Sequence, residues 1–150
     1  MTARLERVNP DLFDRLRSAS PVQQRAAARA ACRFALDYNE LVGPIIDAGW
    51  EAIETAKYGD SRPREQLRAF INQLEAIQRR ARDCVEEGQA SRAQYIAAFR
   101  RARAANSIYY ALSSDAFEAA VESAYEANAA TADIQALVQI ISSAMYISRS

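Results

Sequence analysis

Histidine is absent from this 150-residue sequence, which removes the side chain used most often in general acid–base catalysis. Ser–His and Cys–His nucleophile pairs are therefore excluded, as are metal sites with a histidine ligand. Cys32 and Cys84 lie too far apart to form a CxxC site, and the glycine-rich phosphate-binding and nucleophile-elbow motifs are missing. The sequence thus predicts no catalytic residues, no metal site and no cofactor, and we expect a protein that is not an enzyme.

Glycine and proline are scarce, with four of each, and nearly all of them stand where helices should begin or end. Strands are not predicted, because β-branched and aromatic residues never alternate with polar ones for long. We expect one all-α domain, residues 1–150, built as a single irregular bundle of about six to seven helices. A short stack of helical hairpins is the minor alternative.

Neither charge nor apolar runs indicate a nucleic-acid or membrane partner. Lys plus Arg and Asp plus Glu balance at 19 each, so the net charge is zero. No stretch approaches the ~18 consecutive apolar residues of a membrane-spanning helix, and the N-terminus lacks the apolar run of a signal peptide. We therefore expect a cytoplasmic protein whose cysteines stay reduced.

The clearest helical pattern lies in residues 60–88. Its apolar residues recur at three- and four-residue steps: Leu67, Phe70, Ile71, Leu74, Ile77, Ala81, Cys84 and Val85. Pro63 suits a first helical turn, and Gly88 suits the left-handed position that ends a helix. We predict that this segment is a central helix of the bundle.

Caps and breakers place the other helices. Their predicted starts follow Asn9, Ser20, Gly43, Ser91 and Ser114-Asp115. The first should end near Arg17, the second near Val42 and the third at Tyr58. Residues 128–133 either form a break, with Thr131 capping a last helix, or continue the preceding helix; the weak helix formers in this segment favour the break.

One face of the predicted helix after Gly43 carries three carboxylates, Asp47, Glu51 and Glu54. Asp37 and Glu40 extend this acidic stripe across the preceding turn. A solvated surface is the simplest interpretation. Alternatively, the stripe meets a basic surface on a partner protein, since charges at an interface rim steer association.

Two basic clusters occur later in the chain. They are Arg79, Arg80 and Arg82, and Arg100, Arg101 and Arg103. Glu86 and Glu87 interrupt the first cluster, and no ladder of aromatic residues accompanies the arginines, so nucleic-acid binding is not predicted. We interpret both clusters as solvated faces that pair with neighbouring carboxylates.

Asn106 is a polar residue on an otherwise apolar, small-residue helix face. A buried amide needs hydrogen-bond partners, and the simplest prediction is an interhelical bond to Tyr38, Tyr109 or Asn128. The alternative is a polar pocket formed by Tyr38, Asn106 and Tyr109.

The segment 60–64 is predicted to join two helices. Asp60 or Ser61 is suited to capping the following helix, and Pro63 pre-sets its first turn. An arginine in this segment should reach back to Asp37 or Asp47 and form a bidentate ion pair. The predicted junction consists of Asp60, Arg62, Pro63 and Arg64.

The run from Ala31 to Asn72, with the motifs Ala35-Leu36-Asp37 and Asp60-Ser61-Arg62-Pro63-Arg64, resembles a family of small all-helical immunity proteins of bacterial polymorphic toxin systems. The alanine-rich segment 97–105 and the following helices are similar to that family's second half, so the resemblance covers about two-thirds of the chain. The family carries histidines in its later helices, where Asn106 and the tyrosines stand here. The resemblance implies a cognate protein toxin as partner.

Together these observations predict a non-catalytic protein-binding module that neutralises a bacterial toxin by direct binding. The acidic stripe and the turn before it are the expected contact face. Two other functions fit the sequence: a small-molecule site lined by Asn106 and the tyrosines, and a homo-oligomeric adaptor built on the alanine-rich helices.

Overall fold

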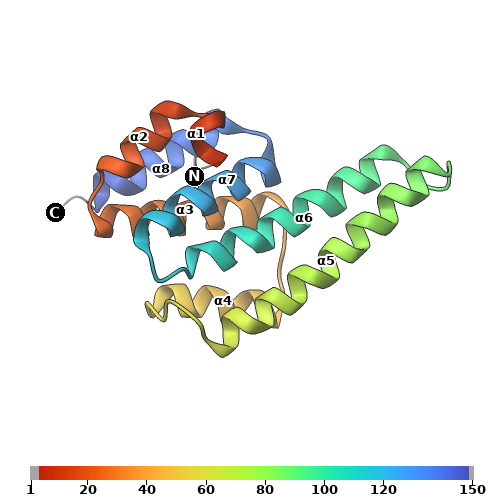
Figure 1. Ribbon diagram of the computed structural model, residues 1–150, viewed down its shortest axis with the longest axis horizontal. Helices are drawn as coiled ribbons and strands as arrows, with labels where there is room; N and C mark the ends of the chain where they lie inside the picture. Colours follow the sequence, from red (N-terminus) through yellow and green to blue (C-terminus); the bar gives the residue numbers. More distant parts are fainter. Residues whose placement is uncertain (1–3, 149–150) are drawn as a thin grey trace.

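Helices form nearly the whole chain in the computed structural model, which describes residues 4–148 (Figure 1). Within that range they are α1 (Arg4–Val8), α2 (Pro10–Ser18), α3 (Pro21–Tyr38), α4 (Pro44–Glu54), α5 (Arg62–Glu86), α6 (Arg92–Ala111), α7 (Ala116–Thr131) and α8 (Ile134–Ile147). The described residues include no strand, so the all-α prediction is confirmed. The five-residue helix α1 was not predicted. None of the described helices is long and apolar enough to span a membrane.

Side-chain caps begin most of the helices. The capping residues are Asn9, Ser20, Ser61, Ser91, Asp115 and Asp133, each of which accepts a hydrogen bond from a backbone N–H in the first turn. These bonds satisfy donors that have no partner within the helix itself. The predicted starts after Asn9, Ser20, Ser91 and Asp115 are confirmed, and Pro63 lies in the first turn of α5 as expected.

The second predicted helix ends earlier than expected, at Tyr38 rather than Val42. Glu40 has a left-handed backbone with φ of 50°, and the N–H of Leu41 donates to the carbonyl of Leu36 at 3.0 Å. The chain therefore turns sharply. Leu41 is buried, whereas Val42, expected on the core face, is 79% exposed.

Two further helix ends are settled by the structure. The helix after Gly43 ends at Glu54, before the predicted Tyr58, and Ala56 then adopts φ of 56°. The break in residues 128–133 is confirmed: α7 ends at Thr131, and Ala132 is left-handed. Asp133, not Thr131, caps α8. The hydroxyl of Thr131 instead donates back to the carbonyl of Ala127.

The centre of the bundle is formed by α3, α6 and α7, which pack against one another. In Figure 1, α1, α2 and α8 lie on one side of these helices and α4 on the other. Small residues dominate the central contacts and are fully buried: Ala27, Ala31 and Ala35 in α3, Ala102, Ala104 and Ala105 in α6, and Ala119, Ala120, Ala124, Ala127 and Ala130 in α7. Without long side chains between them, these helices approach closely.

Helix α5 lies at the edge of the bundle, and the prediction that it is a central helix is wrong. It packs against α4 and α6, and its second half projects with the start of α6 as a helical hairpin (Figure 1). Only Leu67, Ile71 and Leu74 of its apolar stripe are buried, and Ile77 is 50% exposed. Past the part of α5 that packs against α4, α6 is the described helix that covers this stripe.

Candidate functional site

The turn between α3 and α4 exposes apolar and acidic side chains within a short segment. The name α3–α4 corner is used for five exposed residues: Tyr38 at the end of α3, Glu40 and Val42 in the turn, and Asp47 and Glu51 on α4. Tyr38 is 49% exposed and Val42 79% exposed, which is high for side chains of this size. The α3–α4 corner therefore combines apolar surface with three carboxylates.

The predicted acidic stripe divides into paired and unpaired carboxylates. Asp37 pairs with Arg33 one turn earlier on α3, at 2.7 Å. Glu54 receives two hydrogen bonds from Arg29 Nη2, at 2.7 and 2.8 Å. The other three stripe residues, Glu40, Asp47 and Glu51, are exposed and make no ion pair with any residue in the range 4–148. Within the acidic stripe, these three carboxylates are therefore the ones available to a partner protein.

Arginines of α3 fix the orientation of α4. The guanidinium carbons of Arg29 and Arg33 lie 5.6 and 4.8 Å from the ring centroid of Trp50. Such cation–π contacts, together with the Arg29–Glu54 pair, hold the two helices in a defined relationship. The α3–α4 corner is therefore bridged by side chains of α3 and α4, while the body of α4 packs against α5 and α6.

The predicted polar pocket is not assembled, because its three residues meet different arginines. The ring centroid of Tyr38 lies 6.0 Å from the guanidinium carbon of Arg100. Asn106 is buried, and its amide oxygen accepts from Arg103 Nη2 at 3.0 Å and Nη1 at 3.2 Å, so its partner lies on its own helix. Tyr109 lies between two arginines of α5, each 4.1 Å from its ring centroid: Arg64 and Arg68.

The junction before α5 ties α5 to α6 and not to α3 or α4. Arg64 Nε donates to the backbone carbonyl of Tyr109 at 3.1 Å, and Arg64 Nη1 lies 3.6 Å from Asp60. The expected ion pair with Asp37 or Asp47 is therefore not formed by Arg64. Arg62 is exposed, and Pro63 has its predicted role in the first turn. A small hollow of about 180 Å³ is lined by Asp60, Ser61, Arg64, Glu65, Arg68 and Tyr109.

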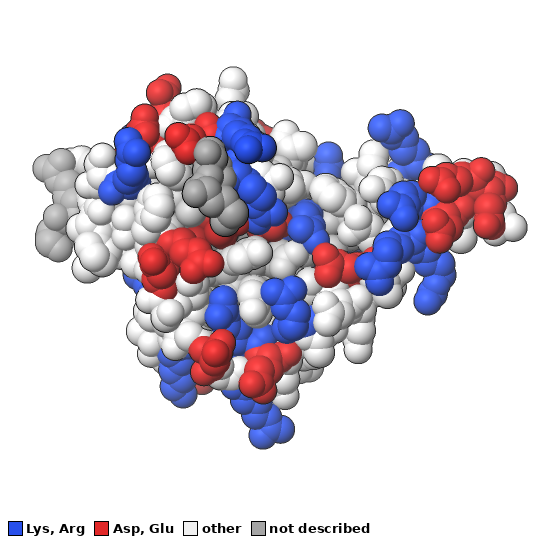
Figure 2. All heavy atoms as spheres, in the orientation of Figure 1, with Lys and Arg blue, Asp and Glu red and all other residues white. Residues whose placement is uncertain are grey.

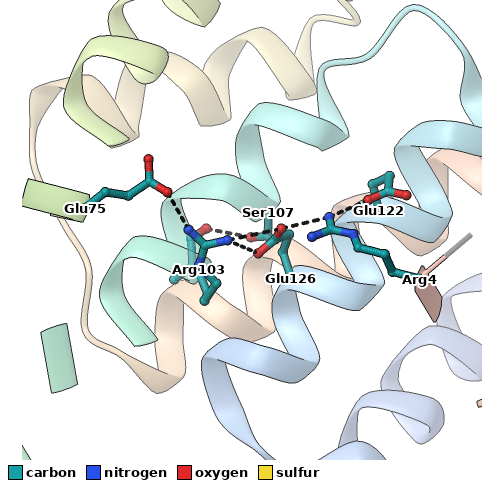
Figure 3. Close-up of polar contacts among 7 residues, drawn as sticks. Arg4, Glu75, Arg103, Ser107, Glu122 and Glu126 are labelled. Carbon is teal, nitrogen blue, oxygen red and sulfur yellow. Dashed lines mark hydrogen bonds and ion pairs between the residues drawn. The ribbon is translucent and has the colours of Figure 1, made fainter. Parts of the chain in front are cut away.

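An ion-pair network centred on the buried Glu126 crosses the bundle where the hairpin leaves it (Figure 3). Arg103 on α6 lies 2.8 Å from Glu75 on α5 and 3.2 Å from Glu126 on α7. Arg4 on α1 lies 3.0 Å from the other oxygen of Glu126 and 2.6 Å from Glu122. Because the Glu126 side chain is only 1% exposed, its charge is balanced almost entirely by these two arginines.

Burial and pairing oppose each other in this network. Burial raises the pKa of the Glu126 carboxyl above its ordinary value, and the positive charges of Arg103 and Arg4 offset only part of that rise. Burial lowers the pKa of Arg4, but its hydrogen bond to Glu122 and the charges of both glutamates outweigh burial, so the net shift is upward. The network thus fixes geometry more than it adds stability.

The sequence interpretation placed Arg103 in a solvated basic cluster and did not single out Glu126. Arg103 differs from its neighbours because its side chain is only 17% exposed. Glu126 sits among buried alanines on α7. A charged residue on a face of small residues was the available signal for both, since such a charge requires a buried partner.

The tip of the hairpin carries charges that have no ion-pair partner among the described residues. Six exposed residues near the end of α5 make no ion pair within residues 4–148: Arg79, Arg80, Arg82, Asp83, Glu86 and Glu87. Figure 2 shows basic side chains along the projecting hairpin and acidic ones gathered at its end. Arg79, Arg80 and Arg82 are exposed as predicted, but the predicted pairing with neighbouring carboxylates is not formed by these three arginines.

The described residues contain no cluster of three or more cysteine, aspartate or glutamate side chains that could hold a metal ion. Cys32 is fully buried, which raises the pKa of its thiol to about 12. Comparisons of the chain with protein-family models, with curated proteins and with solved structures gave no match.

Proposed function

We propose that this protein acts by binding another protein at the α3–α4 corner, without catalysing a reaction. The observation that carries this proposal is the exposure of Val42 and Tyr38 beside three unpaired carboxylates. An apolar centre with a charged rim is the usual composition of a protein interface. The partner surface is expected to be basic, because Glu40, Asp47 and Glu51 then gain counter-ions that residues 4–148 do not supply.

We further propose that the partner is a bacterial toxin, as the resemblance of residues 31–72 to immunity proteins implies. A rigid acidic surface suits inhibition by direct docking, because little conformational entropy is lost on binding. The Arg29–Glu54 ion pair and the cation–π contacts of Trp50 link α3 to α4 and favour that rigidity.

The experiment is affinity capture from the native lysate with the tagged protein, followed by mass spectrometry. The Asp47→Arg/Glu51→Arg variant reverses the charge of the α3–α4 corner. Glu86→Arg/Glu87→Arg is the matched control, since it makes the same charge change at exposed, unpaired residues on the hairpin tip.

We expect one protein to be recovered in stoichiometric amount by the wild type and by the tip variant, and to be lost with the corner variant. If that protein is a toxin, co-expression of the wild type should protect cells from it, and the corner variant should not. Recovery of no partner by the wild type, or equal recovery by both variants, would contradict the proposal.

A further inference from the structure

One face of α5 at the hairpin tip has a charge order that reverses along the helix. At about 100° of rotation per residue, five charged residues near the end of α5 fall within one face about 120° wide. This face, which we call the tip face, carries two arginines, then three carboxylates: Arg79, Arg80, Asp83, Glu86 and Glu87. All five are exposed, and none forms an ion pair among the described residues.

We propose that the tip face binds the tip face of a second copy of this chain, with the two α5 helices antiparallel about a two-fold axis. An axis passing at Asp83 places residue 79 of one copy opposite residue 87 of the other, and residue 80 opposite residue 86. Each arginine then meets a glutamate, twice over by symmetry. Arg79 and Arg80, one turn back on the same helix, flank Asp83 at the axis.

The charge order itself supports a second copy as the occupant. A two-fold rotation turns the tip face into its own electrostatic complement, because arginines precede glutamates along α5. The apolar stripe of α5 lies on the opposite side of the helix and takes no part in this contact. Most alanines of α7 and of the second half of α6 are buried inside the bundle, so they lie away from the tip face.

Size and charge define the kind of dimer to expect. The tip face spans nine residues, or about 12 Å of helix at roughly 1.5 Å per residue. Such a contact is small compared with stable interfaces, so association should be weak. It should also be sensitive to salt, because exposed charges are screened within about 10 Å at ~0.1 M ionic strength.

The test is sedimentation equilibrium with the full-length protein at concentrations up to about 1 mM, at ~20 mM and ~0.5 M salt. We expect the wild-type mass to rise with concentration at low salt and to fall towards the monomer at high salt. Arg79→Glu/Arg80→Glu and Glu86→Arg/Glu87→Arg should each be monomeric, because like charges then face each other. Helicity and thermal midpoint should stay unchanged, since all four residues are exposed.

Sedimentation of a mixture of the two variants is the decisive test of the proposed dimer. One variant then presents five carboxylates and the other four arginines around Asp83, so a heterodimer should form at low salt although neither variant self-associates. Asp47→Arg/Glu51→Arg should dimerise like the wild type, which separates this proposal from binding at the α3–α4 corner. A wild type that stays monomeric at low salt, or a mixture that shows no heterodimer, would overturn the proposal and leave the tip face to a different protein.

Discussion

Arg103 on α6 and Glu126 on α7 form an ion pair at 3.2 Å, and the Glu126 side chain is only 1% exposed to solvent. This pair lies where the hairpin leaves the bundle, and Glu75 and Arg4 extend it to α5 and α1 (Figure 3). The projecting hairpin is therefore linked by charge to α7 directly, and to α1 through Glu126. Breaking one link should affect the whole junction.

Removing one partner of this pair should destabilise the protein strongly. Arg103→Met leaves Glu126 buried with Arg4 as its only counter-ion, and we expect a loss of about 3–5 kcal/mol in the free energy of unfolding, measured by urea denaturation. The double variant Arg103→Met/Glu126→Leu should recover most of this loss, because no buried charge at that position remains unbalanced.

The exposed pair Arg17–Asp14 provides the control, since its side chains are 63% and 60% exposed. Arg17→Met should change the free energy of unfolding by less than about 0.5 kcal/mol. A double variant at least as unstable as Arg103→Met would show that the network stabilises by its charge and not merely by its geometry.

The pH dependence of stability should carry a contribution from Glu126. Its pKa is raised in the folded state, so the folded protein binds a proton more tightly than the unfolded chain. This group's contribution is complete below the unfolded pKa of about 4.3 and is lost as pH rises through the higher folded pKa. Glu126→Gln should therefore have a smaller destabilising effect at pH 7 than at pH 4 in denaturant titrations. An effect that grows with pH would mean that the arginines lower the pKa of Glu126 below its ordinary value.

The two cysteines should differ in reactivity. Cys32 is fully buried with a thiol pKa of about 12, whereas Cys84 on the hairpin is partly exposed. At pH 8, a thiol reagent should label one cysteine in the folded protein and both after unfolding in urea. Loss of rapid labelling in Cys84→Ser would identify the reactive residue. Labelling of Cys32 at a comparable rate in the folded state would contradict the packing of α3.

Close packing of α4 against α5 depends on Gly49. A Cβ atom there would lie 2.8 Å from Leu67 Cδ1 and 3.1 Å from Ile108 Cγ2, and both side chains are fully buried. Gly49→Val adds two more carbons to this contact, so we expect about 1–3 kcal/mol of destabilisation by thermal or urea unfolding. Ala48→Val is the matched neighbour on the less buried side of the helix and should cost less. An effect of Gly49→Val no larger than that of Ala48→Val would contradict the close packing at Gly49, because Gly→Val by itself slightly favours the helix.

The helix positions were predictable because their signals are local. Asn9, Ser20 and Ser91 cap helices through contacts only three residues away, and such contacts can be read from sequence. The early end of α3 at Tyr38 was missed because no glycine marks the left-handed turn, which is made by Glu40. Apolar periodicity also overstated the burial of α5, since it shows an apolar face but not what covers it.

The candidate site was predicted only in part. The acidic stripe is exposed as expected, but two of its carboxylates are paired with arginines of α3. Arg29 pairs with Glu54 on α4, and Arg33 pairs with Asp37 one turn later on α3. The Arg103–Glu126 pair joins residues from two helices across the bundle, so sequence spacing alone did not connect them. Residues that act through long-range contacts need the packed structure to be recognised.

Binding at the α3–α4 corner is tested most directly by calorimetric titration of the purified partner into the wild type, Asp47→Arg/Glu51→Arg and Glu86→Arg/Glu87→Arg. We expect the corner variant to bind at least about tenfold more weakly than the wild type, a change of about 1.4 kcal/mol, and the tip variant to bind with unchanged affinity. The affinity of the wild type should also fall as salt rises. Undiminished binding by the corner variant would contradict the assignment of this surface.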